Sequence, residues 1–123
     1  MRLAAALLLP LALAAGACSS GGGGTGDPFR RCATCHTIAA GGPNAVGPNL
    51  HDVFGRAAAT APGFSYSPAM RASGLTWDEA TLDRFLTNPQ KAVPGTRMAF
   101  AGIADPGQRR EVIAYLKKAG GSR

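Results

Sequence analysis

Two cysteines and a histidine lie within five residues of this chain, and their chemistry is the most specific that the sequence offers. The segment is Cys32-Ala33-Thr34-Cys35-His36. Two thiols three positions apart can each form a thioether bond to one vinyl group of a haem, and the adjacent imidazole is then placed to ligate the iron. The motif predicts one covalent c-type haem, with both cysteines as attachment points and His36 as an axial ligand.

Two other uses of such a motif, a zinc site and a redox-active dithiol, lack support elsewhere in the chain. Zinc normally takes four ligands, and only Cys18 and His51 remain outside the motif. A thioredoxin-like dithiol belongs to a βαβ unit, and the chain has no convincing alternating strand pattern. The motif therefore favours haem.

A methionine is the best candidate for the second iron ligand. Met98 follows Pro94-Gly95, a pair that favours a tight turn able to present the thioether. Such a ligand favours ferrous iron and raises the reduction potential. The alternatives are that Met98 only fills a gap in the core, or that His51 gives a bis-histidine haem. Met70 is interpreted as a packing residue.

The segment Gly47-Pro48-Asn49-Leu50 is a candidate partner for the other ring nitrogen of the proximal histidine. Such a histidine normally donates its second N–H to a carbonyl or carboxylate, which fixes the orientation of the ring. Proline stiffens this loop and leaves a carbonyl available. An ordinary turn is the alternative.

The first residues are predicted to direct export. Arg2 precedes an apolar run over 3–17 that is short for a membrane span and typical of a signal peptide. Residues 13–18 resemble a bacterial lipobox, which implies that Cys18 is lipidated and begins the mature chain. A flexible Gly/Ser linker completes the segment 18–26. The alternatives are a plain secretory peptide and a retained transmembrane anchor.

The remaining domain, 27–123, is small and basic. The full chain carries a formal charge of +6, which becomes +5 (12 basic and 7 acidic residues) once the signal peptide over 1–17 is removed. A domain of this size buries a modest core, so the haem is expected to supply apolar volume. Nothing interleaves aromatic residues with a basic stripe, which argues against nucleic-acid binding. A basic surface suits an acidic protein partner instead.

Helix signals dominate the domain. Asp27-Pro28 predicts an N-cap with proline at the first helical position, and the helix is expected to continue into the haem motif. The segment Thr76 to Glu79 predicts a capping box with Thr76 as the N-cap. It opens a helix that is expected to end near Thr87, because Asn-Pro follows.

Two further helices are expected in the middle and at the end of the domain. Residues 68–72 can form a short helix, and Asp105-Pro106 opens a final helix to about 119. The apolar faces of the two longer helices are formed by Leu82, Phe85, Leu86, Val112, Ile113, Leu116 and Ala119. The predicted class is all-α, with three to five helices and long loops around one covalent haem.

Together these segments resemble class I cytochrome c of the mitochondrial and related bacterial type. The resemblance extends over nearly all of 29–119 and is carried by CATCHTI, GGPN, VGPNLHDVFGR, APGFSYS, GLTW, TNPQKAVPGTRMAFAGI and IAYLKKA. It implies the cytochrome c fold, with His36 and Met98 as axial ligands and the carbonyl of Pro48 as the acceptor for His36. The positions implied to contact the haem propionates are Arg56, Tyr66 and Trp77, and Thr96 lies beside the ligand methionine.

Three features depart from that family. Phe85 and Met70 stand where the family often has tyrosine and asparagine, which hold an internal water together with the residue at Thr96. The distal side of the haem is therefore expected to be drier. An early Pro28 also predicts a short N-terminal helix with a small contact near Tyr115.

The resemblance implies a one-electron carrier and not an enzyme. Iron that cycles between Fe(III) and Fe(II) with both axial positions filled needs no bound substrate. We expect an exported, lipid-tethered monomer on the periplasmic side of a bacterial membrane that meets acidic redox proteins. The cations expected to face such partners are Arg30, Arg31, Lys91 and Arg97. The alternatives are a haem enzyme or gas sensor with an open iron position, and a fixed haem subunit of a larger oxidoreductase.

Overall fold

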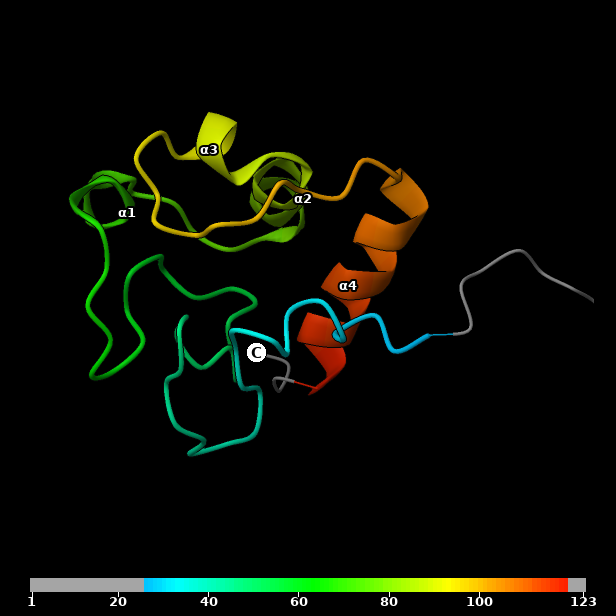
Figure 1. Ribbon diagram of the computed structural model, residues 1–123, viewed down its shortest axis with the longest axis horizontal. Coiled ribbons are helices and arrows are strands. Elements are labelled where there is room, and N and C mark those ends of the chain that lie inside the picture. Colours follow the sequence, from blue (N-terminus) through cyan, green and yellow to red (C-terminus); the bar gives the residue numbers. More distant parts are fainter. Residues whose placement is uncertain (1–25, 120–123) are drawn as a thin grey trace, which may run out of the picture.

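In the computed structural model, which describes residues 26–119, the helices are short and the loops between them are long. The helices are α1 (Pro68–Ala72), α2 (Glu79–Thr87), α3 (Pro89–Ala92) and α4 (Pro106–Ala119). Figure 1 shows α1, α2 and α3 along one side of the domain, α4 along a second side, and the loops between 36 and 66 along a third. The predicted all-α class is confirmed, since the described residues form only an isolated antiparallel bridge between Ala57 and Thr76 and no longer strand.

The predicted export segment lies outside the described residues. This applies to the signal peptide over 1–17, to Cys18 and to the linker up to residue 25. Within the described part, no helix is long and apolar enough to cross a membrane.

Helix α2 begins two residues later than the capping pattern predicts. Its N-cap is Asp78, whose carboxylate accepts the N–H of Thr81 at 2.8 Å, and this bond lowers the pKa of the Asp78 carboxyl. Trp77 stays out of the helix because its N–H and its carbonyl both bond to the backbone of 55–56, at 2.9 and 2.7 Å. The interpretation of Thr76 as the N-cap is therefore wrong, since this pairing keeps the segment extended.

Helix α3 is not among the predicted elements. Helix α2 ends at Thr87 as expected, because Asn88 has an extended backbone with φ of −160°. The side chain of Asn88 then accepts the N–H of Lys91 at 3.1 Å, and Pro89 takes the first helical position. One residue thus ends α2 and begins α3, so the two helices are joined without a loop.

The segment that leads into the cysteine motif forms successive turns instead of the predicted helix. The carbonyl of Phe29 accepts the N–H groups of Cys32 and Ala33, and the carbonyl of Cys32 accepts those of Cys35 and His36, at 2.8–3.0 Å. Each of these two carbonyls accepts two N–H groups, from the residues three and four positions later, so the hydrogen bonds stay within single turns. A continuous ladder of α-helical hydrogen bonds is therefore not formed over 28–36.

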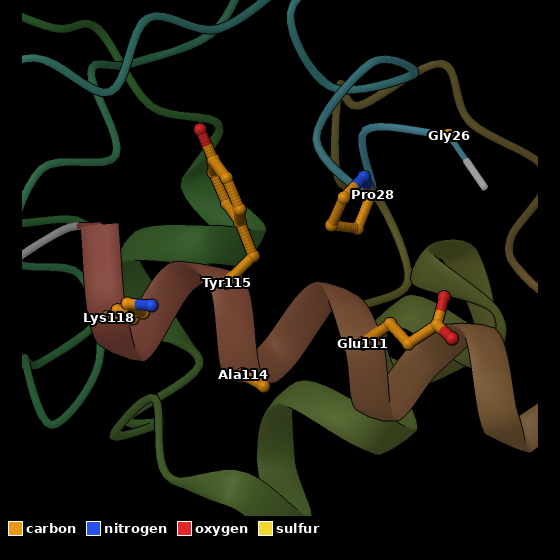
Figure 2. Close-up of a pocket in the computed structure, with 6 residues that line it drawn as sticks. All are labelled: Gly26, Pro28, Glu111, Ala114, Tyr115 and Lys118. Carbon is orange, nitrogen blue, oxygen red and sulfur yellow. The ribbon is translucent and has the colours of Figure 1, made fainter. Parts of the chain in front are cut away.

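An aromatic pair anchors this N-terminal segment on α4. The ring of Phe29 stacks on Tyr115, with centroids 5.3 Å apart and planes inclined by 18°. Figure 2 shows Tyr115 and Pro28 facing a shallow groove along α4, which has a volume of about 350 Å³. The segment therefore leaves part of this face of α4 uncovered beside the aromatic stack.

Helix α4 packs against α2 with the predicted apolar face. Val112, Ile113 and Leu116 are buried, as is the predicted apolar face of α2. Ala119 differs from the prediction, because it is exposed together with the two lysines that precede it. The last turn of the helix thus extends beyond the core that covers the rest of this face.

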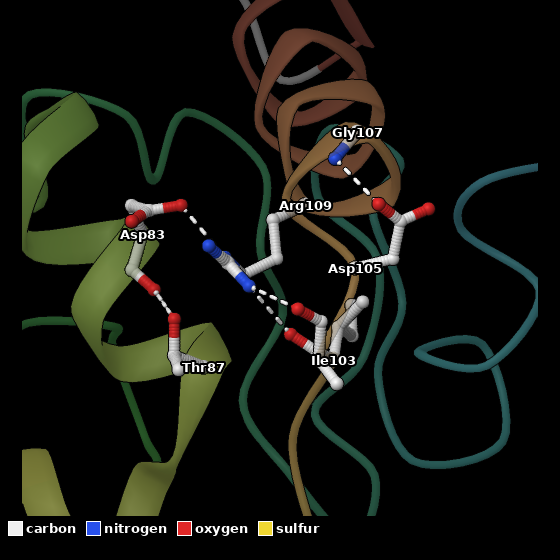
Figure 3. A network of polar contacts seen from close by, with 7 residues as sticks. Asp83, Thr87, Ile103, Asp105, Gly107 and Arg109 are labelled. Carbon is white, nitrogen blue, oxygen red and sulfur yellow. Dashed lines mark hydrogen bonds and ion pairs between the residues drawn. The ribbon is translucent and has the colours of Figure 1, made fainter.

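An arginine on α4 bonds to α2 and to the loop before α4. The Nε atom of Arg109 donates to a carboxylate oxygen of Asp83 at 2.8 Å, and Nη1 donates to the carbonyls of Ile103 and Ala104, both at 2.9 Å. Figure 3 shows the guanidinium lying between α2 and the segment that leads into α4. The arginine side chain is only 12 % exposed, so these bonds replace hydration that it has lost.

Replacing Arg109 with methionine should lower the free energy of unfolding by about 2–3 kcal/mol, because it removes hydrogen bonds from a charged, largely buried donor. Methionine keeps the apolar stem, and urea unfolding of the haem-loaded protein measures the change. The control is Arg110→Met at the next, exposed position, which should change the free energy by less than about 0.5 kcal/mol. Equal effects of the two substitutions would contradict the role given to Arg109.

Candidate haem site

The predicted haem residues line one cavity of about 610 Å³. Its volume lies within the range of about 300–1,000 Å³ that is usual for cofactor and ligand sites. The wall is largely apolar and is built from the N-terminal turns, the loops over 46–59 and 64–67, α1, α2, the segment 96–100 and α4. The predicted site residues in this wall are Cys32, Cys35, His36, Pro48, Arg56, Tyr66, Trp77, Thr96 and Met98. Segments far apart in the sequence therefore converge on one site.

The two motif cysteines lie half-buried in the cavity wall. Burial raises the pKa of the Cys32 thiol, and the positive charge of Arg31 acts in the opposite direction. The turn described above fixes the relation between the groups, since the N–H groups of Cys35 and His36 share the carbonyl of Cys32. Both thiols and the imidazole are thus presented to the same cavity.

The loop after the motif holds the imidazole of His36. Nδ1 lies 2.7 Å from the carbonyl oxygen of Pro48. Because a carbonyl can only accept, Nδ1 carries the proton and Nε2 keeps its lone pair. Burial lowers the pKa of His36, while the bond to Pro48 acts in the opposite direction. A neutral imidazole with a lone pair on Nε2 is the form that ligates a metal.

Glycine is required at position 47 by this arrangement, a role that the sequence pattern alone does not indicate. The N–H of Gly47 donates to the carbonyl of Cys35 at 2.8 Å, which holds the loop against the ring. A Cβ atom at this position would overlap the ring atoms of His36. The sequence signal is the Gly47-Pro48 pair, which marks a turn without showing what the turn approaches.

Met98 lies half-buried in the same wall on a turn with its own hydrogen bonds. The N–H of Thr96 donates to Val93 at 3.0 Å, and the N–H of Met98 donates to Oγ1 of Thr96 at 3.3 Å. The segment then returns to α2, where the N–H of Ile103 donates to the carbonyl of Leu86 at 2.8 Å. One end of the Met98 segment is therefore bonded to the end of α3, and the other end is bonded to α2.

His51 and Met70, the other side chains considered as iron ligands, differ in their relation to the cavity. His51 is not part of the cavity wall, and its Nδ1 lies 3.2 Å from the carbonyl oxygen of Ile38. Met70 is part of the wall and is buried. The wall therefore offers two thioethers, at Met70 and Met98, and one imidazole, at His36.

Two polar side chains in the wall are suited to an acidic group. Nη1 of Arg56 donates to the carbonyl of His51 at 3.0 Å, whereas its Nε is buried without a hydrogen-bond partner among the described residues. Such a donor is costly to bury, and an anion beside it would satisfy it. The hydroxyl of Tyr66 accepts the N–H of Ala61 at 3.0 Å, which leaves its own O–H able to donate. The carboxylates of haem propionates have the required chemistry, so the residues present fit a haem.

The wall on the α2 side is apolar where the related family is often polar. Phe85 and Met70 are both buried in the wall, and Phe85 packs on Trp77 with ring centroids 5.0 Å apart. Neither Phe85 nor Met70 carries an oxygen or nitrogen in its side chain. The drier distal side beside Thr96 stays a prediction that rests on these two residues.

The four cations expected to face partners are all exposed, but they have different surroundings. Arg31 and Arg97 border the cavity, whereas Arg30 and Lys91 do not. Nη2 of Arg31 also donates to Oε1 of Gln108 at 2.9 Å. Two of the four expected cations thus lie at the cavity itself.

The family model for cytochrome c matches residues 29–120. This chain belongs to the cytochrome c family. Cytochrome c2 from Rhodoblastus acidophilus is 49 % identical over 106 residues, which cover 80 % of this chain and 99 % of that protein. Cytochrome c from Kluyveromyces lactis is 48 % identical over 89 residues, which cover 72 % of this chain and 81 % of that protein. The solved structure of cytochrome cH from Methylobacterium extorquens is similar, with a TM-score of 0.69 and 46 % identity, covering 73 % of this chain and 90 % of that chain.

Membership of the cytochrome c family establishes the cofactor and the class of function. The expected cytochrome c fold is confirmed by the similarity to cytochrome cH. The chain is a c-type haem electron carrier, with the covalent haem predicted from the cysteine motif. The haem supplies one-electron redox chemistry when it is bound, and the protein supplies its attachment and its electrostatic surroundings.

Proposed function

We propose that this cytochrome c shuttles single electrons at the periplasmic side of a bacterial membrane, with His36 and Met98 as the axial ligands of its iron. The observation that supports this most strongly is the cavity shared by the cysteine motif, the Met98 turn and an imidazole whose Nδ1 lies 2.7 Å from the carbonyl oxygen of Pro48. Two protein ligands suit electron transfer, because neither has to leave when the iron changes its oxidation state.

The residues of the cavity have separate tasks in this proposal. Cys32 and Cys35 attach the cofactor covalently, and Pro48 fixes the ring of His36 through the bond to Nδ1. The apolar wall excludes water, which strengthens the remaining electrostatic interactions. The residues proposed to hold the propionates are Arg56, Tyr66 and Trp77.

Potentiometric titration of the matured protein tests the carrier function. We expect one reversible one-electron transition, with the same midpoint in the oxidative and the reductive direction, since both ligands are retained. A multi-electron transition, or a midpoint that depends on the direction of titration, would contradict simple electron shuttling.

We also propose that Arg31 and Arg97 at the cavity, together with Arg30 and Lys91, attract acidic redox partners. The bimolecular rate constant with an acidic redox protein should then fall about tenfold or more as salt is raised from low to physiological concentration. The reason is that the Debye length shortens from about 30 Å at 0.01 M to about 8 Å at 0.15 M salt. Stopped-flow absorbance measures this rate, and reduction by an uncharged small molecule is the control that should change little. An unchanged rate with the acidic partner would remove the steering role.

A lipid on Cys18 is proposed to tether the monomeric domain to the membrane surface. The support is the order of the segments, in which the apolar leader is followed directly by Cys18 and then by a Gly/Ser-rich linker. Mass spectrometry of the mature N-terminus should find Cys18 as the first residue with an acyl modification. An unmodified Cys18 would overturn the tether without affecting the proposed electron transfer.

A further inference from the structure

The side chain of Gln90 connects the turn that carries Met98 to α3. Nε2 of Gln90 donates to the carbonyl oxygen of Thr96 at 2.8 Å. Thr96 lies two residues before Met98 and is only 8 % exposed. Because buried carbonyls are nearly always hydrogen-bonded in folded proteins, Gln90 satisfies a group that water reaches poorly.

Helix α3 gives this donor a fixed position. Asn88 caps the helix by accepting the N–H of Lys91 at 3.1 Å, and Pro89 is less than 2 % exposed. The N–H groups of Ala92 and Val93 donate to the carbonyls of Asn88 and Pro89, at 3.0 and 2.9 Å. The amide of Gln90 thus belongs to a well-anchored helical turn, whereas its acceptor belongs to a loop.

The other hydrogen bonds near Met98 hold the ends of its segment, lie within the turn or are long. The bond from Met98 to Thr96 lies within the turn and would move with it, whereas the bonds from Thr96 to Val93 and from Ile103 to Leu86 hold the two ends of the segment. Nη1 of Arg97 reaches the carbonyl of Ser65 at 3.5 Å on the exposed surface, which is a long distance for a hydrogen bond. The bond from Gln90 is therefore the one that holds the carbonyl of Thr96 itself, between the two attached ends of the segment.

We propose that Gln90 is a positioning residue that keeps the Met98 turn seated at the cavity wall. The proposal rests on the ligation by His36 and Met98 proposed above. Gln90 is not part of the cavity wall, so it acts through the backbone of Thr96 and has no direct contact with the cofactor site. Its loss should increase the fraction of molecules in which the turn has moved away.

Imidazole binding to the ferric protein measures that fraction. An external ligand binds only where the Met98 turn has moved, so its apparent affinity rises in proportion to the open fraction. Loss of one hydrogen bond that exists only in the closed turn should raise the apparent affinity about three- to tenfold. We expect this increase in the full-length, haem-loaded variants Gln90→Ala and Gln90→Glu. Glutamate has the shape of glutamine but cannot donate when ionised, so it tests the hydrogen bond without shortening the side chain.

The matched control is Gln108→Ala. This substitution also truncates a glutamine and removes one side-chain bond, the 2.9 Å contact with Arg31, but it lies on α4 and not beside the Met98 turn. Its imidazole affinity should stay within about twofold of the wild-type value, since surface changes of this kind usually have small effects. Equal affinities of the Gln90 variants and the wild-type protein, or an equal increase in Gln108→Ala, would overturn the role of Gln90.

The absorption spectrum separates this proposal from the one on which it rests. The wild-type ferric protein should show the sulfur-to-iron charge-transfer band, and imidazole should abolish it. If the band is present and the Gln90 variants bind imidazole like the wild-type protein, only the role of Gln90 is overturned. A wild-type protein without the band would overturn both the Met98 ligation and the role of Gln90.

Discussion

Replacing Cys32 and Cys35 together with serine should leave the chain without a cooperatively folded domain. The cavity that they border measures about 610 Å³. At about 24 cal/mol per Å³ of residual cavity, leaving this volume empty would cost up to about 15 kcal/mol. That amount equals the upper end of the total stability of an ordinary domain, about 5–15 kcal/mol. The far-ultraviolet helix signal should be largely lost, and a thermal scan should show no cooperative transition.

The matched control for this substitution is Thr34→Ser. Thr34 lies between the two cysteines and is exposed, so the change alters the motif while retaining both thiols. The control should bind haem and melt cooperatively at nearly the wild-type temperature. A cooperative transition in the haem-free double variant would show that the polypeptide completes its core without the cofactor.

Under the proposed ligation, the ferrous wild-type protein should not bind carbon monoxide, and the variant Met98→Ala should bind it stoichiometrically. Alanine cannot ligate iron, so the position that we propose for the Met98 thioether would become available. The ferric protein should also lose its sulfur-to-iron charge-transfer band. Its reduction potential should fall, because a thioether ligand raises the potential. Absorption spectroscopy and potentiometry measure these changes.

Met70 is the control for the ligand assignment, since it is the other methionine in the cavity wall. Met70 is 8 % exposed, and leucine has a similar volume, so Met70→Leu should cost less than about 1.5 kcal/mol. This variant should keep the charge-transfer band and should not bind carbon monoxide. Loss of the band in Met70→Leu, together with its retention in Met98→Ala, would exchange the roles of the two methionines.

The features that the sequence predicts well depend on neighbouring residues. Five consecutive residues define the haem attachment motif, and a Pro-Gly turn four residues before Met98 marks the candidate ligand. The start of α4 at Pro106 follows from the pair Asp105-Pro106. The buried faces of α2 and α4 follow from helical spacing, and only Ala119 breaks the pattern, because the end of α4 extends beyond the core.

The features that the sequence does not predict depend on which backbone segments lie against one another. Helix α2 starts late because Trp77 pairs with residues about 20 positions earlier, which no local capping pattern records. Gly47 is needed because a loop eleven residues after His36 passes against its ring. The bond from Gln90 to Thr96 exists because the four-residue helix α3 ends close to the Met98 turn. Each of these requires knowledge of which segments meet in space.

The most direct test of the proposed function is the absorption spectrum of the matured wild-type protein, recorded in both oxidation states with and without carbon monoxide. Ligation by His36 and Met98 predicts a low-spin spectrum, a sulfur-to-iron charge-transfer band in the ferric state and no response of the ferrous state to carbon monoxide. A high-spin spectrum, or a ferrous spectrum that shifts with carbon monoxide, would mean that one axial position is open. That result would contradict the proposed ligation and favour a haem enzyme or a gas sensor.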